Sequence, residues 1–151
     1  DGTKRPTRRL ARVLAPIAGD YDYVFLDCPP SISLVSESVF EAADALLVPL
    51  IPATLSARTY EQLRVVVAGG PQLLAFFSML DRRKGLHRDL AEQLPREYPE
   101  VLRTVIPNAA DVERMGVHRT VLEEFAPRGR AARAYRELWV EIGERLANGG
   151  G

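Results

Sequence analysis

Short apolar runs alternate along the chain with segments whose apolar residues recur at helical spacing. These runs are mostly apolar and predict buried strands. They cover residues 23–26, 45–50, 73–79 and 101–106. Helices are predicted over residues 34–43, 56–68, 86–98, 110–117 and 130–147. Four strands separated by helices favour parallel pairing, and therefore an α/β fold with a doubly wound, mainly parallel sheet and flanking helices.

Three of the helical segments show an apolar face at helical spacing. One of these segments precedes the first predicted strand. It is predicted to end near Pro16 and the Gly19-Asp20 pair, because proline removes a backbone donor and Gly-Asp favours a turn. Its apolar positions are Leu10, Val13, Leu14 and Ile17. In residues 56–68 the positions expected to point inward are Tyr60, Leu63, Val66 and Val67. In residues 130–147 they are Tyr135, Leu138, Trp139, Ile142 and Leu146.

Composition narrows the class of protein. The 151 residues show no internal boundary, so residues 1–151 are interpreted as one domain or part of one. Twenty Lys and Arg balance twenty Asp and Glu, and overall charge therefore predicts no binding to nucleic acid or membrane. A single cysteine, Cys28, excludes an internal disulfide framework. No apolar run approaches the roughly 18 residues of a membrane span, and a cytoplasmic location is expected.

Polar residues and prolines follow the predicted strands, where an open parallel sheet places its ligand site. Asp27 follows the run Val24-Phe25-Leu26, and Pro107 and Asn108 follow the last strand. A carboxylate fixed at a strand end can hold the water shell of Mg²⁺ beside phosphates. The pattern alone leaves a second interpretation open, in which Asp27 only begins a turn before two prolines.

The wider sequence around Asp27 resembles a known family. Residues 22–31, 36–44 and 47–52, followed by 79–83 and 105–108, resemble ParA-type ATPases, which partition chromosomes and plasmids and are relatives of the MinD cell-division ATPases. The resemblance implies a P-loop NTPase-like fold that uses ATP and Mg²⁺. It makes Asp27 the catalytic Walker B aspartate that holds Mg²⁺ through water, and places Pro29 and Pro30 in a switch segment. Pro107 and Asn108 would then lie near the adenine.

The chain departs from this family in the phosphate-binding part. Lys4 and Lys84 are its only lysines, and neither lies in a G-x-x-x-x-G-K-[ST] motif. The chain is therefore expected to be the C-terminal part of an ATPase domain, truncated at its N-terminus and inactive alone in ATP hydrolysis. Ser78 and Met79 also stand where the family often has an Asn or Thr, which weakens the case for base recognition by that loop.

The sequence contains two clusters of basic residues, and each can be interpreted either as a solvated surface or as a contact with nucleic acid. One contains Arg82, Arg83, Lys84 and Arg88, and the other contains Arg128, Arg130, Arg133 and Arg136. The resemblance implies an ATP-dependent dimer of the chain with itself, nonspecific DNA binding through the second cluster, and stimulation by a ParB-like protein. The location would be cytoplasmic and nucleoid-associated, without membrane binding, because the chain ends in Asn-Gly-Gly-Gly after a core-facing helix.

Other functions stay open or are set aside. A non-catalytic DNA-binding or partner-binding module and a MinD-like positioning ATPase are the alternatives to a partitioning ATPase. A receiver-like phosphoacceptor is set aside, since the required acidic pair and lysine are missing. Cys28 is interpreted as an inert small hydrophobe, and His87 and His118 as solvated side chains.

Overall fold

The computed structural model describes residues 8–28 and 34–149. Within these residues three parallel strands form one open sheet in the order β1 (Ala45–Leu50), β2 (Gln72–Leu80) and β3 (Val101–Pro107). Each connection between neighbouring strands contains a helix, as parallel pairing requires. β2 is therefore the central strand, and all three strands direct their carboxyl ends to the same edge of the sheet.

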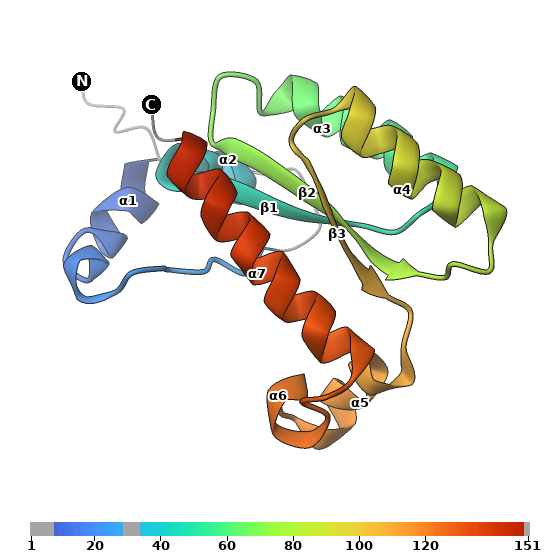
Figure 1. Ribbon diagram of the computed structural model, residues 1–151. Helices are drawn as coiled ribbons and strands as arrows, with labels where there is room; N and C mark the ends of the chain where they lie inside the picture. Colours follow the sequence, from blue (N-terminus) through green and yellow to red (C-terminus); the bar gives the residue numbers. More distant parts are fainter. Residues whose placement is uncertain (1–7, 29–33, 150–151) are drawn as a thin grey trace, which may run out of the picture.

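The remaining elements are helical (Figure 1). Two lie before β1: α1 (Arg8–Leu14), which is followed by a 3₁₀ turn at Ala18–Asp20, and α2 (Leu34–Ala42). The crossover helices are α3 (Thr54–Val66) and α4 (Gly85–Glu97). After β3 come α5 (Ala110–His118), α6 (Leu122–Phe125) and the long α7 (Arg130–Gly149). The helix predictions are confirmed within a few residues, but the sequence analysis did not predict α6.

Helices cover both faces of the sheet (Figure 1). On one face, Ala75 and Phe77 of β2 pack with residues of α3 and α4, among them Tyr60 and Leu94. On the other face, a second core joins β2 and β3 to α7; its buried members are Leu74, Phe76, Leu102, Ile106, Ala134, Leu138 and Ile142. Successive residues of β2 therefore face opposite helical layers, which is why the strand is apolar throughout. The predicted doubly wound α/β class is confirmed.

The segment 23–26, predicted as a buried strand, is not one. Its backbone is extended but pairs with none of the described strands, and Phe25 is 71% exposed. The rings of Tyr23 and Phe25 instead contact Trp139 of α7, with ring centroids 4.9 and 6.1 Å apart. An apolar run forms a strand only where another strand supplies backbone partners, and the described residues supply none beside it.

Three predictions of inward-facing residues are also wrong, because Val66, Tyr135 and Trp139 are exposed. Val66 is exposed, because it lies beyond the buried stripe that Tyr60, Leu63 and Val67 form on α3. Trp139 is 45% exposed, because it lies at the margin of the α7 stripe centred on Leu138. Trp139 therefore meets the extended segment 23–26 rather than the sheet.

Candidate functional site

A solvent-open cleft of about 730 Å³ lies at the carboxyl ends of β2 and β3. The residues lining it come from these strands, the loops that follow them, and α7; they are Leu80, Asp81, Arg82, Arg83, Arg103, Thr104, Val105, Pro107, Asn108, Arg130, Ala134 and Glu137. Open parallel sheets bind their ligands at this edge. Four arginines line the cleft against two carboxylates, so its charge favours an anionic ligand.

The turn after β2 forms one wall of the cleft. The Asp81 carboxylate accepts hydrogen bonds from the Arg83 backbone N–H, Nε and NH2, at 3.0, 2.9 and 2.8 Å. These bonds, with the charge of the guanidinium, hold the pKa of Asp81 well below its usual range. The Asp81 side chain is only 13% exposed, whereas that of Arg83 is 90% exposed. Arg83 is therefore neutralised inside the turn although it lies at the surface.

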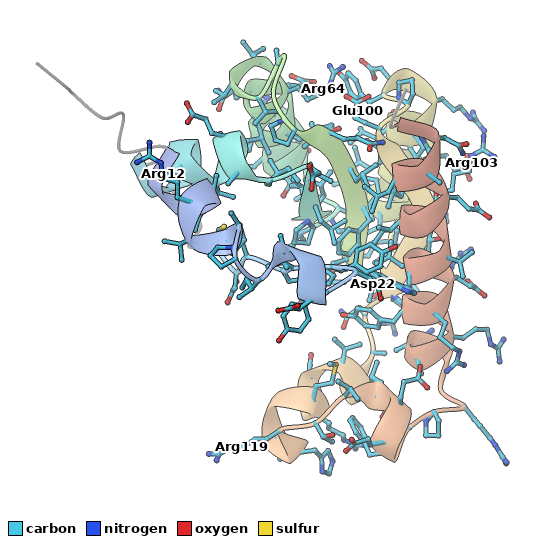
Figure 2. The ribbon with its side chains drawn as sticks, turned by 90° about the vertical axis from the view of Figure 1, so that its left-hand side faces the viewer. Arg12, Asp22, Arg64, Glu100, Arg103 and Arg119 are labelled. Carbon is cyan, nitrogen blue, oxygen red and sulfur yellow. The ribbon has the colours of Figure 1, made fainter. Side chains whose placement is uncertain are left out.

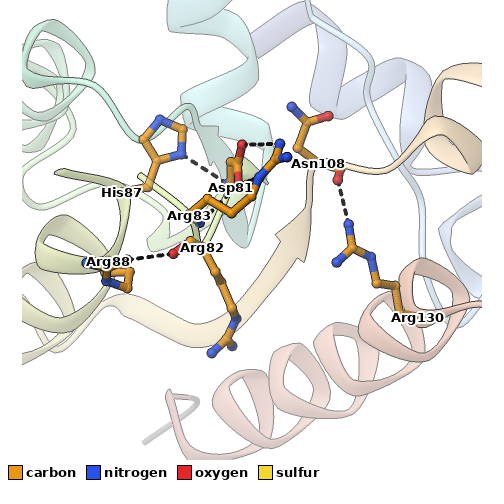
Figure 3. A network of polar contacts seen from close by, with 7 residues as sticks. All are labelled: Asp81, Arg82, Arg83, His87, Arg88, Asn108 and Arg130. Atoms are coloured by element: carbon orange, nitrogen blue, oxygen red, sulfur yellow. Dashed lines mark hydrogen bonds and ion pairs between the residues drawn. The ribbon is translucent and has the colours of Figure 1, made fainter. Parts of the chain in front are cut away.

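Helix α4 fixes the same turn from the other side (Figure 3). The Asp81 backbone N–H donates to Nδ1 of His87 at 3.0 Å, and NH1 of Arg88 donates to the Arg82 carbonyl at 2.8 Å. His87 is half-buried, so the interpretation of this histidine as a solvated side chain is wrong. Sequence offers no signal for this contact, because it depends on α4 folding back on the turn. His118 is exposed, as expected, with its ring 4.6 Å from that of Phe125.

The loop after β3 forms the opposite wall. The backbone N–H of Asn108 donates to the Leu80 carbonyl at 2.9 Å, which joins the ends of β2 and β3. The Asn108 carbonyl accepts a hydrogen bond from NH2 of Arg130 at 2.8 Å. Figure 3 shows this contact beside the Asp81 turn. The structure thus brings Pro107, Asn108 and Arg130, which the sequence analysis assigned to two different sites, into a single cleft.

The middle of β3 adds residues that the sequence analysis missed. Arg103 and Thr104 line the cleft, and their backbone N–H groups both donate to the carboxylate of Glu141 on α7, each at 2.8 Å. Burial alone would raise the pKa of Glu141, but these two hydrogen bonds and the nearby Arg145 guanidinium lower it overall. In the described part of the chain, the guanidinium groups of Arg82 and Arg103 contact no acceptor or carboxylate. They are the cleft arginines that are free to bind an anion.

Asp27 does not line this cleft. It is exposed at the end of the extended segment 23–26, and the neighbouring Cys28 thiol donates to the Leu26 carbonyl at 3.3 Å. The expectation of an aspartate held by a buried strand is therefore not met, since that strand does not form. Pro29 and Pro30 lie outside the described residues.

The predicted cluster of arginines around the start of α7 divides into two kinds. Arg136 is held by Glu123 of α6 at 2.7 Å and donates to the Pro127 carbonyl, and Arg130 donates to Asn108. Arg128 and Arg133 are exposed, and no ion pair to either occurs within the described residues. Local pairing therefore neutralises Arg136 and leaves Arg128 and Arg133 available.

Within residues 8–28 and 34–149, no three His, Cys, Asp or Glu side chains are grouped to hold a metal ion. One exposed carboxylate such as Asp27 still fits Mg²⁺, which proteins commonly bind through one or two carboxylates and the phosphates of a ligand. None of the helices described is both long enough and apolar enough to span a membrane.

Comparison with solved structures gives the class of fold. The structure of the cell division ATPase MinD from Pyrococcus furiosus superposes with a TM-score of 0.73 over 91% of this chain and 58% of that chain, at 18% sequence identity. The likeness extends over the open parallel sheet and the helices that pack on it. The chain has this fold.

Sequence comparisons find relatives of the chain among ParA-type proteins. A family model described as an AAA domain matches residues 1–69. The sporulation initiation inhibitor protein Soj of Bacillus subtilis is 28% identical over 93% of this chain and 58% of its own length. The chromosome-partitioning ATPase Soj of Treponema pallidum is 26% identical over 88% of this chain and 56% of its length. The chain is similar in sequence to these Soj proteins and spans little more than half of their length.

Proposed function

We propose that this chain contributes the base-binding part of a ParA-type partitioning ATPase. The observation that supports the proposal is the basic cleft at the carboxyl ends of β2 and β3, with Pro107 and Asn108 on its wall. A relative named as a chromosome-partitioning ATPase, Soj of Treponema pallidum, matches 88% of the chain. The chain covers little more than half the length of the two Soj relatives. We therefore propose ATPase activity for the complete protein and not for this chain alone.

The residues of the cleft suit a nucleotide. The Asn108 side-chain amide can both donate to and accept from the edge of an adenine, and the Pro107 ring offers an apolar face to the base. Arg82 and Arg103 supply positive charge beside the phosphates. Asp27 would hold the water shell of Mg²⁺, with Pro29 and Pro30 in the segment that responds to the nucleotide. When bound, Mg²⁺ neutralises the charge that develops on the transferred phosphoryl group.

The nucleotide site can be tested by titrating Mg·ATP into the ¹⁵N-labelled chain and following the backbone amides by NMR. We expect shifts at Asn108 and at the 81–83 turn, and a loss of these shifts in Asn108→Ala but not in the matched control Asn148→Ala. Unchanged amides at both places, at millimolar ATP, would contradict the proposal.

ATP hydrolysis by the chain alone should be absent, because none of its 151 residues forms a G-x-x-x-x-G-K-[ST] phosphate loop. Turnover that disappears in Asp27→Ala would show that other residues hold the triphosphate.

The same proposal includes nonspecific DNA binding by an ATP-dependent dimer. Arg128, Arg130, Arg133 and Arg136 are the proposed phosphate contacts, and the free guanidinium groups of Arg82 and Arg103 extend this basic surface. In the same proposal a ParB-like protein stimulates release of the DNA. The complete protein would then be cytoplasmic and associated with the nucleoid.

A non-catalytic module that binds DNA or a partner is the alternative, and one observation favours it. Asp27 is exposed at the end of an unpaired segment and is absent from the cleft lining. DNA binding that is independent of ATP, together with no amide shift on adding nucleotide, would favour this alternative. A MinD-like positioning role is distinguished by ATP-dependent binding to lipid vesicles in place of DNA.

A further inference from the structure

His87 occupies an unusual position for a histidine at the start of a helix. It is the third residue of α4 and is half-buried, and its Nδ1 lies 3.0 Å from the backbone nitrogen of Asp81. A backbone nitrogen can only donate, so Nδ1 accepts and carries no proton. The contact therefore exists only while the imidazole is neutral.

The hydrogen bond holds the first residue of the turn that joins β2 to α4. This turn begins two residues after Met79, whose φ of 57° is uncommon for a residue other than glycine. The Lys84 N–H closes the turn on the Asp81 carbonyl at 3.1 Å, and Arg88 holds the Arg82 carbonyl. No side chain other than His87, in the part of the chain described, accepts the Asp81 N–H. Loss of this bond leaves a half-buried donor without a partner beside a strained residue.

Charged groups lie close to His87 in the chain. The turn carries Arg82, Arg83 and Lys84, and Arg88 lies one residue further along α4. The N-terminus of α4 adds the positive end of its macrodipole. The negative charges close by in the chain are Asp81, already bound by Arg83, and Asp89 on α4. On the adjacent α3, which shares a core with α4, the charged residue of the first two turns is Arg58.

We propose that His87 is a proton-sensitive latch that fixes the 81–84 turn when neutral and releases it when protonated. Histidine side chains change charge between about pH 5 and 8. The hydrogen bond is present at the alkaline end of this window and is lost as the pH falls through the titration of the ring. Release changes the position of Arg82 and Arg83, so protons control the shape of one wall of the cleft. The inference goes beyond the proposed function and holds whichever anion the cleft binds.

The test is NMR of the full chain between pH 8 and pH 5, without ligand. At pH 8 the ring nitrogens of His87 should show the tautomer protonated at Nε2. On acidification the Asp81 amide should shift with the same midpoint as the His87 ring. Its hydrogen exchange, corrected for intrinsic rate, should become at least about tenfold faster, because one buried hydrogen bond is lost. Asp81 stays ionised over this range, since Arg83 holds its pKa low.

Two variants separate the latch from a general effect of pH. The side-chain oxygen of His87→Asn can occupy the place of Nδ1 without titrating, so the Asp81 amide should stay protected down to pH 5. In His87→Ala the amide should exchange rapidly at every pH. His118→Ala, which removes an exposed titrating ring, should respond like the wild type. An Asp81 amide that does not follow the His87 titration, or a His87 ring protonated at Nδ1 at pH 8, would overturn the proposal even if His87→Ala failed to fold.

Discussion

The carboxylate of Glu141 on α7 accepts the backbone N–H of Arg103 on β3 at a distance of 2.8 Å, and its second oxygen accepts the N–H of Thr104 at the same distance. Two consecutive N–H groups of a regular strand point to opposite sides, so one carboxylate can bind both only where the strand is irregular. The pairing of β2 with β3 shifts register in this region, between the pairs Ala75 with Val101 and Phe77 with Val105. Glu141 thus binds both N–H groups at the irregular part of β3, where Arg103 and Thr104 line the cleft.

Removing the Glu141 carboxylate should destabilise the fold more than removing an exposed side chain of the same helix. We expect Glu141→Ala to lower the free energy of unfolding by about 2–3 kcal/mol, because it leaves two backbone donors of β3 unpaired. Urea denaturation measures the loss. Glu144→Ala, an exposed glutamate on the same helix, is the matched control and should change stability by less than about 0.5 kcal/mol. Equal stability of the two variants would contradict the assigned role.

The free energy of unfolding should decrease at acid pH, where Glu141 and Asp81 become protonated. The pKa values of Glu141 and Asp81 are both lowered by hydrogen bonds to their charged forms. A group with a depressed pKa in the folded state contributes stability above its unfolded pKa, about 4 for these side chains, and loses it as the pH falls through the folded value. Denaturation midpoints measured from pH 6 to pH 3 should therefore decline below about pH 5. Glu141→Gln should show a shallower decline; an unchanged slope would reject its part in the effect.

The buried hydroxyl of Tyr60 predicts a stabilising substitution. Tyr60 is 1% exposed, and its Oη has no hydrogen-bond partner within the described residues. Burial raises the pKa of this hydroxyl, and the nearby Glu100 carboxylate raises it further. We expect Tyr60→Phe to increase the free energy of unfolding by about 1 kcal/mol, because it removes an unsatisfied polar atom and keeps the ring.

Tyr98→Phe is the control for this ring pair. Its hydroxyl donates to Glu61 at 3.4 Å and its ring lies under the Arg64 guanidinium, which pairs with Glu100. Losing the hydroxyl should cost stability slightly rather than increase it. Figure 2 shows Arg64 and Glu100 side by side at the end of the molecule away from Arg119. Neither Tyr60 nor Tyr98 lines the cleft, so neither substitution should alter it. Destabilisation by Tyr60→Phe would show that Oη has a bound partner, such as water.

If the start of α7 binds DNA, its arginines should contribute unequally. Neutralising Arg133 should reduce the slope of log affinity against log salt by about 0.9, the value for one phosphate contact. Neutralising Arg136 should change the slope less, since Glu123 already pairs with it at 2.7 Å. Fluorescence anisotropy at several salt concentrations tests this, with Arg96→Gln, an exposed arginine of α4, as the control. Equal slopes for all three variants would show that Arg133 and Arg136 are solvated surface residues that do not contact DNA.

Exposed apolar residues predict association of the purified chain. Phe25 is 71% exposed, and Leu47 and Ile51 at β1 and just beyond it are also exposed. Apolar side chains beside an unpaired strand edge favour contacts between copies. Sedimentation velocity should show a sedimentation coefficient that rises with concentration, and Phe25→Ser should reduce the rise. A strict monomer at every concentration would contradict this expectation.

Local pattern alone was enough for most of the architecture. The strands 45–50, 73–79 and 101–106 and their intervening helices were predictable, because each strand is mainly apolar and contributes side chains to a core under the helices. The same reasoning failed at 23–26, whose residues have the composition of a strand. Composition reports how well a segment suits a sheet, but a strand exists only if another strand pairs with it.

The α/β class, the family resemblance and the edge of the sheet where polar residues collect can be inferred from the chain alone, since these follow from the order of local patterns. Which of those residues share a site depends on how the elements pack. This packing joined Asn108 to Arg130, added Arg103, and left Asp27 outside the cleft. In the folded chain, His87 and Glu141 also accept hydrogen bonds from backbone N–H groups. Every residue except proline carries such a donor, so the pattern of side chains does not mark these contacts; only the packing of helices on the sheet selects them.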